Sequence, residues 1–147
     1  MESSDPTVVR SIAVTAEDVV SALEMNESSP EHAVLRVTPP FSGRMRARLH
    51  VTVEGEYDQQ PAPLHVDPET LLADPPSYPR PADTEDELRN DPEESYTVDR
   101  HHERHREAVQ EWRDAVAATI RDRAELATDE GDQTVSVTVL GEPATAE

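Results

Sequence analysis

The sequence predicts an α+β fold, namely a ferredoxin-like split β-α-β sandwich with both helices on one face of an antiparallel sheet. Three observations predict it. Apolar periodicity gives the element order β-α-β-β-α-β, with an acidic, proline-rich insertion before the second helix. The short connection between the second and third strands favours a hairpin that joins two β-α-β halves. The later strands alternate apolar and polar residues, as a sheet covered on one face requires. The main alternative is a sheet whose second face is covered by the insertion.

The N-terminal part of the chain predicts a strand followed by a helix. Residues 7–14, TVVRSIAV, are rich in β-branched side chains, which favour extended backbone. Thr15 then occupies the N-cap position of a helix, where a hydroxyl accepts a hydrogen bond from a free backbone N–H. The helix has one apolar face and ends between Asn26 and Pro30. The residues of that face recur at i, i+3, i+4 and i+7, and they are Ala16, Val19, Val20 and Leu23.

Two strands joined by a short turn are expected next. Residues 32–38 predict the second strand, and Pro39 and Pro40 end it because proline has no backbone N–H to donate to a sheet. Residues 41–43 complete a hairpin connection to a third strand at residues 44–53. This third strand alternates apolar and polar side chains more regularly than the other segments. One face carries Met45, Ala47, Leu49, Val51 and Val53, and the other carries Arg44, Arg46, Arg48, His50 and Thr52.

Residues 55–97 are expected to form an acidic, proline-rich excursion within the domain. They hold 8 of the 13 prolines and 12 carboxylates with only two arginines, a composition that disfavours helix interiors and central strands. One short strand and one helical turn are expected inside the excursion, with the turn starting at Asp67 and Pro68. The segment from residue 74 to 94 is expected to be irregular. The apolar anchors of the strand and the turn are Leu64, Val66, Leu71 and Leu72.

A long helix is expected after the excursion. It starts either at Asp91 and Pro92 or near Thr97, and it ends before Gly131. The part from residue 100 to 107 contains no apolar residue, so we expect it to extend beyond the core. The apolar stripe of the remainder consists of Val109, Trp112, Val116, Ile120 and Ala127.

A last strand and a tail complete a single domain that spans residues 1–147. Residues 134–140, TVSVTVL, alternate valine with threonine or serine, which predicts a strand with its valines facing the core. Residues 141–147 are expected to be a disordered acidic tail.

Charge is the most informative property of the composition. The chain carries 32 acidic residues against 13 basic residues, all of them arginine, for a net charge of -19. Such acidity is typical of disorder, but here the acids are spread over segments with regular apolar periodicity. A folded domain in concentrated salt meets both conditions, because a Debye length of about 3 Å at 1 M removes most self-repulsion. We therefore expect a protein of an extreme halophile, and a partly disordered acidic protein of a mesophile is the alternative.

Several classes of protein are excluded or disfavoured. The chain has no cysteine, which excludes disulfides, zinc ribbons and thiol catalysis. No run approaches the roughly 20 apolar residues of a membrane span. Residues 1–10 lack the basic flank and apolar stretch of a signal peptide. We expect a cytoplasmic protein that does not contact a membrane.

A basic patch is the strongest candidate site. Residues 32–53 hold four arginines and no acidic residue, a charge of +4, whereas the other 125 residues carry 9 - 32 = -23. On the open face of a sheet these arginines would bind an anion, and the candidate partners are an acidic protein or a nucleic acid. The alternative is internal pairing with an acidic stretch of the excursion. The candidate binding residues are Arg36, Arg44, Arg46, Arg48 and His50, and the acids of the alternative are Asp83, Glu85, Asp86 and Glu87.

Two histidines are the candidate metal ligands. His101 and His105 are four residues apart and share a helix face, so both could bind one divalent metal ion. A third ligand would have to come from elsewhere, such as His50 or a carboxylate of the excursion. This pair supports the second functional hypothesis, a metal-dependent hydrolase-like enzyme. The alternative is a solvated, charged helix end. We predict no other cofactor.

Three segments carry a resemblance to a known set of proteins. TPPFSGRMRARLHV, AVTAEDVVSALE and YTVDRHHERHREAVQEWRDAV resemble a family of hypothetical proteins of halophilic archaea. The resemblance covers most of the chain, implies a haloarchaeal origin and transfers no catalytic residue. The first functional hypothesis is therefore a non-enzymatic binding or interaction protein of a haloarchaeal cytoplasm, which holds an anionic partner on its arginine-lined sheet face. The oligomeric state is not predicted.

Overall fold

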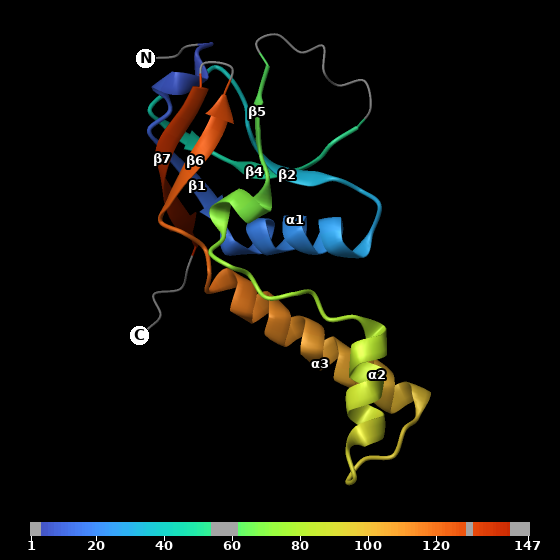
Figure 1. Ribbon diagram of the computed structural model, residues 1–147. Helices are drawn as coiled ribbons and strands as arrows, with labels where there is room; N and C mark the ends of the chain where they lie inside the picture. The colour runs from blue at the N-terminus through green and yellow to red at the C-terminus, as the bar shows by residue number, and fades with distance from the viewer. Residues whose placement is uncertain (1–3, 54–61, 129–130, 142–147) are drawn as a thin grey trace.

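The structure, a computed structural model, describes residues 4–53, 62–128 and 131–141, and it is a mixed α+β fold (Figure 1). The predicted tail therefore lies outside the described residues, apart from Gly141. No helix within the described ranges is long and apolar enough to cross a membrane. The strands are β1 (Ser11–Thr15), β2 (Ala33–Val37), β3 (Arg44–Arg46), β4 (Arg48–Val51), β5 (Leu64–Val66), β6 (Arg123–Thr128) and β7 (Gly131–Leu140). The helices are α1 (Ala16–Ser28), α2 (Pro81–Asn90) and α3 (Val98–Ala117), with 3-10 turns at Pro6–Val8 and Pro68–Leu71.

The strands of the described residues form two sheets. One has the order β3-β1-β7-β6, in which β1 is parallel to β3 and β7 while β6 and β7 pair antiparallel. The other has the order β4-β2-β5 and is antiparallel throughout. The expected α+β class is confirmed. The ferredoxin-like topology is not confirmed, because the strands are divided between two sheets instead of forming one antiparallel sheet.

A bent segment at Ala47 links the two sheets. β3 pairs with β1, the backbone N–H of Ala47 donates to the carbonyl oxygen of Ala13 at 2.9 Å, and β4 then pairs with β2. Ala47 has no exposed surface, so only a small side chain fits the inside of this corner. The predicted third strand is thus two strands. β4 does pair antiparallel with β2, but the predicted tight hairpin is wrong, because β3 lies within the connection.

Helix α1 covers one end of the sheets and completes the core (Figure 1). The predicted N-cap is confirmed, because Oγ1 of Thr15 accepts a hydrogen bond from the backbone N–H of Asp18 at 3.1 Å. The buried residues of α1 lie in one cluster with the inward residues of both sheets, and they are Val19, Val20, Ala22 and Leu23. The expected strand and turn of the excursion are also confirmed, as β5 and the 3-10 turn that follows Asp67.

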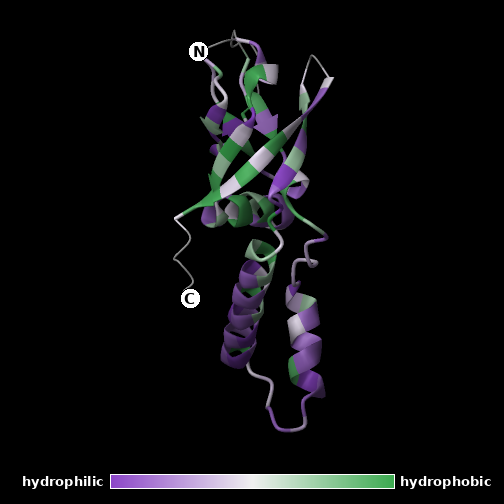
Figure 2. Cartoon of the chain, turned by 90° about the vertical axis from the view of Figure 1, so that its left-hand side faces the viewer, coloured by the Kyte–Doolittle hydropathy of each residue, from purple (hydrophilic) through white to green (hydrophobic). Residues whose placement is uncertain are grey.

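Helices α2 and α3 form an arm that projects away from the sheets (Figures 1 and 2). α3 begins after Thr97, one of the two predicted starts, and Oγ1 of Thr97 accepts from the N–H of Arg100 at 3.0 Å. The polar first half of α3 extends beyond the core, as expected, and packs against α2. Two expectations are wrong: the segment from residue 74 to 94 contains α2, and α3 ends at Ala117, so that residues 123–128 form strand β6 instead of continuing the helix.

A proline-rich segment before α2, residues 75–79, ties the arm to α1 and is called the strap below. Within it, the carbonyl oxygen of Pro76 accepts a hydrogen bond from Nε1 of Trp112 at 2.9 Å. The ring of Tyr78 packs edge-on against Trp112, with centroids 4.8 Å apart. The Tyr78 hydroxyl donates to Oε2 of Glu24 at 3.3 Å, and the same carboxylate accepts from Nε and Nη2 of Arg113 at 2.8 and 2.9 Å. One glutamate of α1 therefore holds both the strap and α3.

This contact predicts a loss of stability at alkaline pH. Burial raises the pKa of Tyr78 above its ordinary value of 10.0, and the charge of Glu24 raises it further. Folding thus favours the neutral phenol, so this contribution to stability is complete below pH 10 and is lost as pH rises through the raised pKa. We expect the phenolate absorbance of Tyr78 to appear above that of a free tyrosine. The difference between the alkaline absorbance titrations of the wild type and Tyr78→Phe gives the titration of Tyr78 alone. A Tyr78 midpoint at or below the ordinary value would contradict the prediction.

Candidate anion-binding site

Three arginines project from the bent segment that joins the sheets. Arg44, Arg46 and Arg48 are spaced by two residues on β3 and β4, so they share the outer face while Ala47 points inward. Arg44 and Arg48 are exposed, and Arg46 is half-buried. Among the described residues, no carboxylate lies within 4.0 Å of any of the three guanidinium groups.

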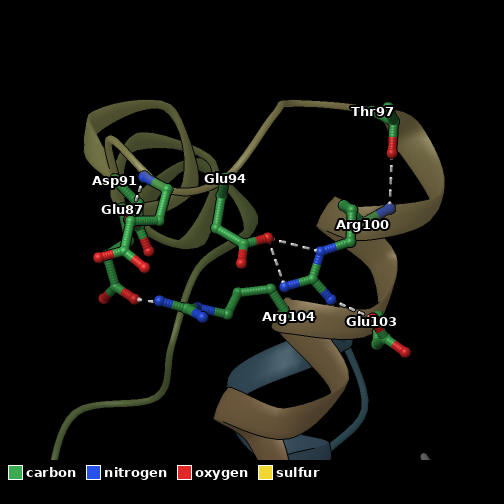
Figure 3. A network of polar contacts seen from close by, with 8 residues as sticks. Glu87, Asp91, Glu94, Thr97, Arg100, Glu103 and Arg104 are labelled. Carbon is green, nitrogen blue, oxygen red and sulfur yellow. Dashed lines mark hydrogen bonds and ion pairs between the residues drawn. The ribbon is translucent and has the colours of Figure 1, made fainter.

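The acids that could have neutralised these arginines lie elsewhere. Glu85 and Glu87 are on α2, where Glu85 pairs with Arg89 at 2.9 Å and Glu87 approaches Arg104 of α3 at 3.9 Å. Arg100 lies beside them and pairs with Glu94 at 2.7 Å (Figure 3). Asp83 and Asp86 are exposed on the same helix, outside ion-pair distance of the sheet arginines. The acidic stretch therefore belongs to the arm, and the alternative of its pairing with Arg44, Arg46 and Arg48 is wrong.

A groove lies beside Arg44 and Arg46 on the outer face of the first sheet. In the register of the sheet, Arg44 is opposite Ser11 and Arg46 is opposite Ala13. Ser11 and Ala13 are small, whereas Arg44 and Arg46 on β3 and Thr138 and Leu140 on β7 are larger, so the middle strand forms the floor of a trough. Its volume is about 520 Å³. This lies in the range of about 300–1,000 Å³ that small-molecule sites occupy. Its wall on β7 is formed by Thr138 and Leu140.

Arg46 carries an unsatisfied donor at the edge of this groove. Its Nε is fully buried and has no hydrogen-bond partner among the described residues. A buried donor without a hydrogen-bond partner lowers the stability of the folded state by about 1–3 kcal/mol. An acceptor near Arg46 would therefore stabilise this region. A carboxylate or phosphate oxygen is the acceptor that guanidinium groups bind best.

A second basic cluster occupies the outer face of the other sheet. Arg36 lies opposite Arg48 on β4 and opposite His65 on β5. Nη1 of Arg36 is 3.2 Å from Nδ1 and 3.1 Å from Nε2 of His50, and the rings of His50 and His65 have centroids 5.5 Å apart. Arg36 and Arg48 are like charges directly opposite on neighbouring strands, an arrangement that by itself destabilises a sheet. The structure thus brings Arg36, Arg48 and His50 together and adds His65.

Further polar residues of this face come from strands whose place the sequence did not reveal. Ser136 of β7 lies opposite Ser11 on one side and opposite Arg123 of β6 on the other. Arg44, Ser11, Ser136 and Arg123 therefore form one row across four strands, with a guanidinium at each end and two hydroxyls between them. The apolar spacing predicts a helix through Arg123, so the sequence did not predict its position on the sheet.

Comparison with known proteins assigns the chain to a family. Residues 1–141 match the model of a family described as "Domain of unknown function (DUF8009)". The chain belongs to this family. No curated protein and no solved structure matches it.

The predicted histidine pair of the DUF8009 chain lies in the arm. It is far along the sequence from the outer sheet face that carries Arg44, Arg46 and Arg48, which is called the arginine face below. Oγ1 of Thr84, a buried residue of α2, is 3.1 Å from Nε2 of His101 and 3.0 Å from Nδ1 of His105. Nε2 of His101 also donates to the carbonyl oxygen of Pro81 at 2.9 Å. Within the described part of the chain, no group of three or more histidine, aspartate, glutamate or cysteine side chains could hold a metal ion. The contacts shown by this pair join α3 to α2.

Proposed function

We propose that this DUF8009 chain is a binding protein that holds an anionic partner on the arginine face of its two sheets. One observation carries the proposal. Arg44, Arg46 and Arg48 lie on the outer face without a carboxylate within 4.0 Å among the described residues, in a chain of net charge -19. A protein with so many acids could neutralise its basic residues internally, as the arm does. Leaving these three available favours an external anion.

The residue type also supports the proposal. Each guanidinium presents donors in a planar fork that matches a carboxylate or a phosphate with two parallel hydrogen bonds. The half-buried position of Arg46 reduces the competition of water and salt for such a contact, because screening weakens exposed ion pairs most. The face offers histidine rings but no described phenylalanine, tyrosine or tryptophan on which nucleic-acid bases would stack. Recognition by charge and geometry fits this surface better than recognition by stacking.

The composition favours a particular setting for this function. All 13 basic residues are arginine, and 32 acids surround one basic face. Concentrated salt would screen the repulsion among the acids while bidentate arginine contacts persist, since these depend on direct hydrogen bonds as well as on charge. We therefore place the protein in the cytoplasm of a haloarchaeon as part of the same proposal.

Citrate serves as the anionic probe of this face. Replacing Arg46 and Arg48 together with glutamine is expected to weaken citrate binding at least about 100-fold. Each lost charge-assisted contact is expected to cost about 1.5–3 kcal/mol, and the two substitutions remove one contact from each sheet. Isothermal titration calorimetry of the full chain with citrate, at two salt concentrations, measures the effect.

The matched control is the double variant Arg80→Gln and Arg106→Gln, which removes the same charge from exposed arginines outside the face. It should retain citrate binding within about twofold. Equal losses in both double variants would mean that citrate responds only to net charge. Such a result, or the absence of citrate binding to the wild type, would overturn the proposal.

A further inference from the structure

We propose that the groove beside Arg44 and Arg46 binds a small organic acid with an apolar body, in which a carboxylate or a phosphate is joined to a short hydrocarbon part. The inference rests on the proposed function and names the class of ligand for one half of the arginine face. It follows from three features of the groove: two guanidinium groups on one wall, an apolar residue at the far end, and a short floor.

The anionic end of the ligand is fixed by the wall on β3. Arg44 and Arg46 are two residues apart, so their side chains leave the strand about 7 Å apart on the same side. Two arginines at this separation can converge on one carboxylate or phosphate from either side. The hydroxyl of Ser11 lies across from Arg44 and can donate a further hydrogen bond to the same group.

The apolar end of the ligand is fixed by the wall on β7. Leu140 is 38% exposed, one of three large apolar residues with that much exposure in the described chain, and it lines this groove. Ala13 continues the apolar surface along the floor from Leu140 toward Arg46. An aliphatic chain lying from Arg46 to Leu140 would cover Ala13 and Leu140, and removal of this apolar surface from water favours binding.

The size of the groove and the charge around it favour a small ligand over a polymer. The floor comprises residues 11–13, which span about 7 Å along the strand and can therefore hold only a short acid. On the same face, beyond the row of Ser11 and Ser136, Glu125 of β6 and Asp132 of β7 present carboxylates. A polyanion that continued past the groove would meet these acids, whereas a small acid ends before them.

Titration of the full chain with sodium octanoate, below its micelle concentration, tests the inference. We expect octanoate to bind at least about tenfold more tightly than acetate, because acetate has the head group without the apolar body. Arg44→Gln and Leu140→Ser should each weaken octanoate at least about tenfold, whereas Arg80→Gln, an exposed arginine outside the face, should change it less than about twofold. Arg44 and Leu140 are both exposed, so their substitution leaves the core intact. Octyl phosphate is titrated in parallel, and either amphiphile supports the inference if it shows both dependences.

Two results would overturn the inference, and they separate it from the proposed function. If citrate binds with the predicted dependence on Arg46 and Arg48 while neither octanoate nor octyl phosphate depends on both Arg44 and Leu140, the arginine face is an anion site without an apolar subsite. If octanoate binds equally to the wild type and to Leu140→Ser, it occupies another surface. Chemical shift changes at the methyl groups of Ala13 and Leu140 provide an independent readout, and their absence at saturating octanoate would also overturn the inference. Failure of citrate binding and octanoate binding together would remove both proposals.

Discussion

Replacing Trp112 with alanine is expected to lower the free energy of unfolding by about 3–5 kcal/mol. The indole is only 4% exposed and lies in the main core cluster. It also packs against Tyr78 and donates to Pro76, so that its loss leaves a cavity and frees the strap. The Arg113–Glu24 ion pair between α3 and α1 would remain, but it is part-exposed and therefore weak. Chemical denaturation monitored by circular dichroism measures the loss.

Trp112→Phe is the matched control for this variant. Phenylalanine keeps most of the buried ring and removes the Nε1 hydrogen bond to Pro76, so we expect a loss of about 1–2 kcal/mol. The difference between the two variants then measures the ring itself. An alanine variant no less stable than the phenylalanine variant would show that the ring does not fill the core as described.

The second large effect is expected in the arm, where Leu88→Ala should unfold α2 locally. Leu88 has no exposed surface but lies outside the main core cluster, so its contacts belong to the interface between α2 and α3. Truncation of a buried leucine costs about 2–5 kcal/mol, which exceeds what a ten-residue polar helix retains without packing. Amide hydrogen exchange should therefore lose protection in α2 and in the first half of α3, while β1 and β7 keep theirs.

Val98→Ala provides the comparison for this variant. Val98 is at the start of α3 and is 62% exposed, so the substitution should change exchange in the arm by no more than about 0.5 kcal/mol. Loss of protection in β1 and β7 of Leu88→Ala, to the same extent as in α2, would contradict the description of the arm as a separate packing unit.

Local signals in the sequence predicted the elements that local chemistry determines. Thr15 and Thr97 each cap a helix with a side-chain oxygen, and the short strand and turn of the excursion follow from a few apolar anchors next to Asp67. The alternation of residues 44–53 correctly placed the arginines on one face and Ala47 on the other. These features depend on neighbours within a few residues, which is the range that periodicity reports.

Features decided by distant partners could not be predicted in the same way. The alternation of residues 44–53 is the same whether they form one strand or two, so the change of partner at Ala47 left no trace in the pattern. Ile120 continues the spacing of α3, but the helix ends before it, and Ala124 and Leu126 alternate as buried residues of β6 instead. Helix α2 lacks an apolar stripe because its inward residues are only Thr84 and Leu88.

The candidate site shows the same division. Arg44, Arg46 and Arg48 could be predicted as an exposed group because they follow one another on a strand. Ser11, which forms the floor of the groove, becomes part of the site only through its register with Arg44. His65 likewise joins His50 only because β5 pairs with β2. A single sequence contains no signal for such pairings between strands.

The pairing of β1 with β7 has a consequence for the order of folding. Ser11 lies opposite Ser136, a separation of 136 - 11 = 125 residues, whereas α2 and α3 are neighbours in the chain. Contacts of high sequence separation form slowly, because a long loop must close before they contribute. The arm can therefore fold early, whereas the first sheet can form only after β7 has been synthesised. Since Thr138 and Leu140 of that strand form a wall of the groove, a nascent chain acquires its candidate ligand site only after residue 140 has been synthesised.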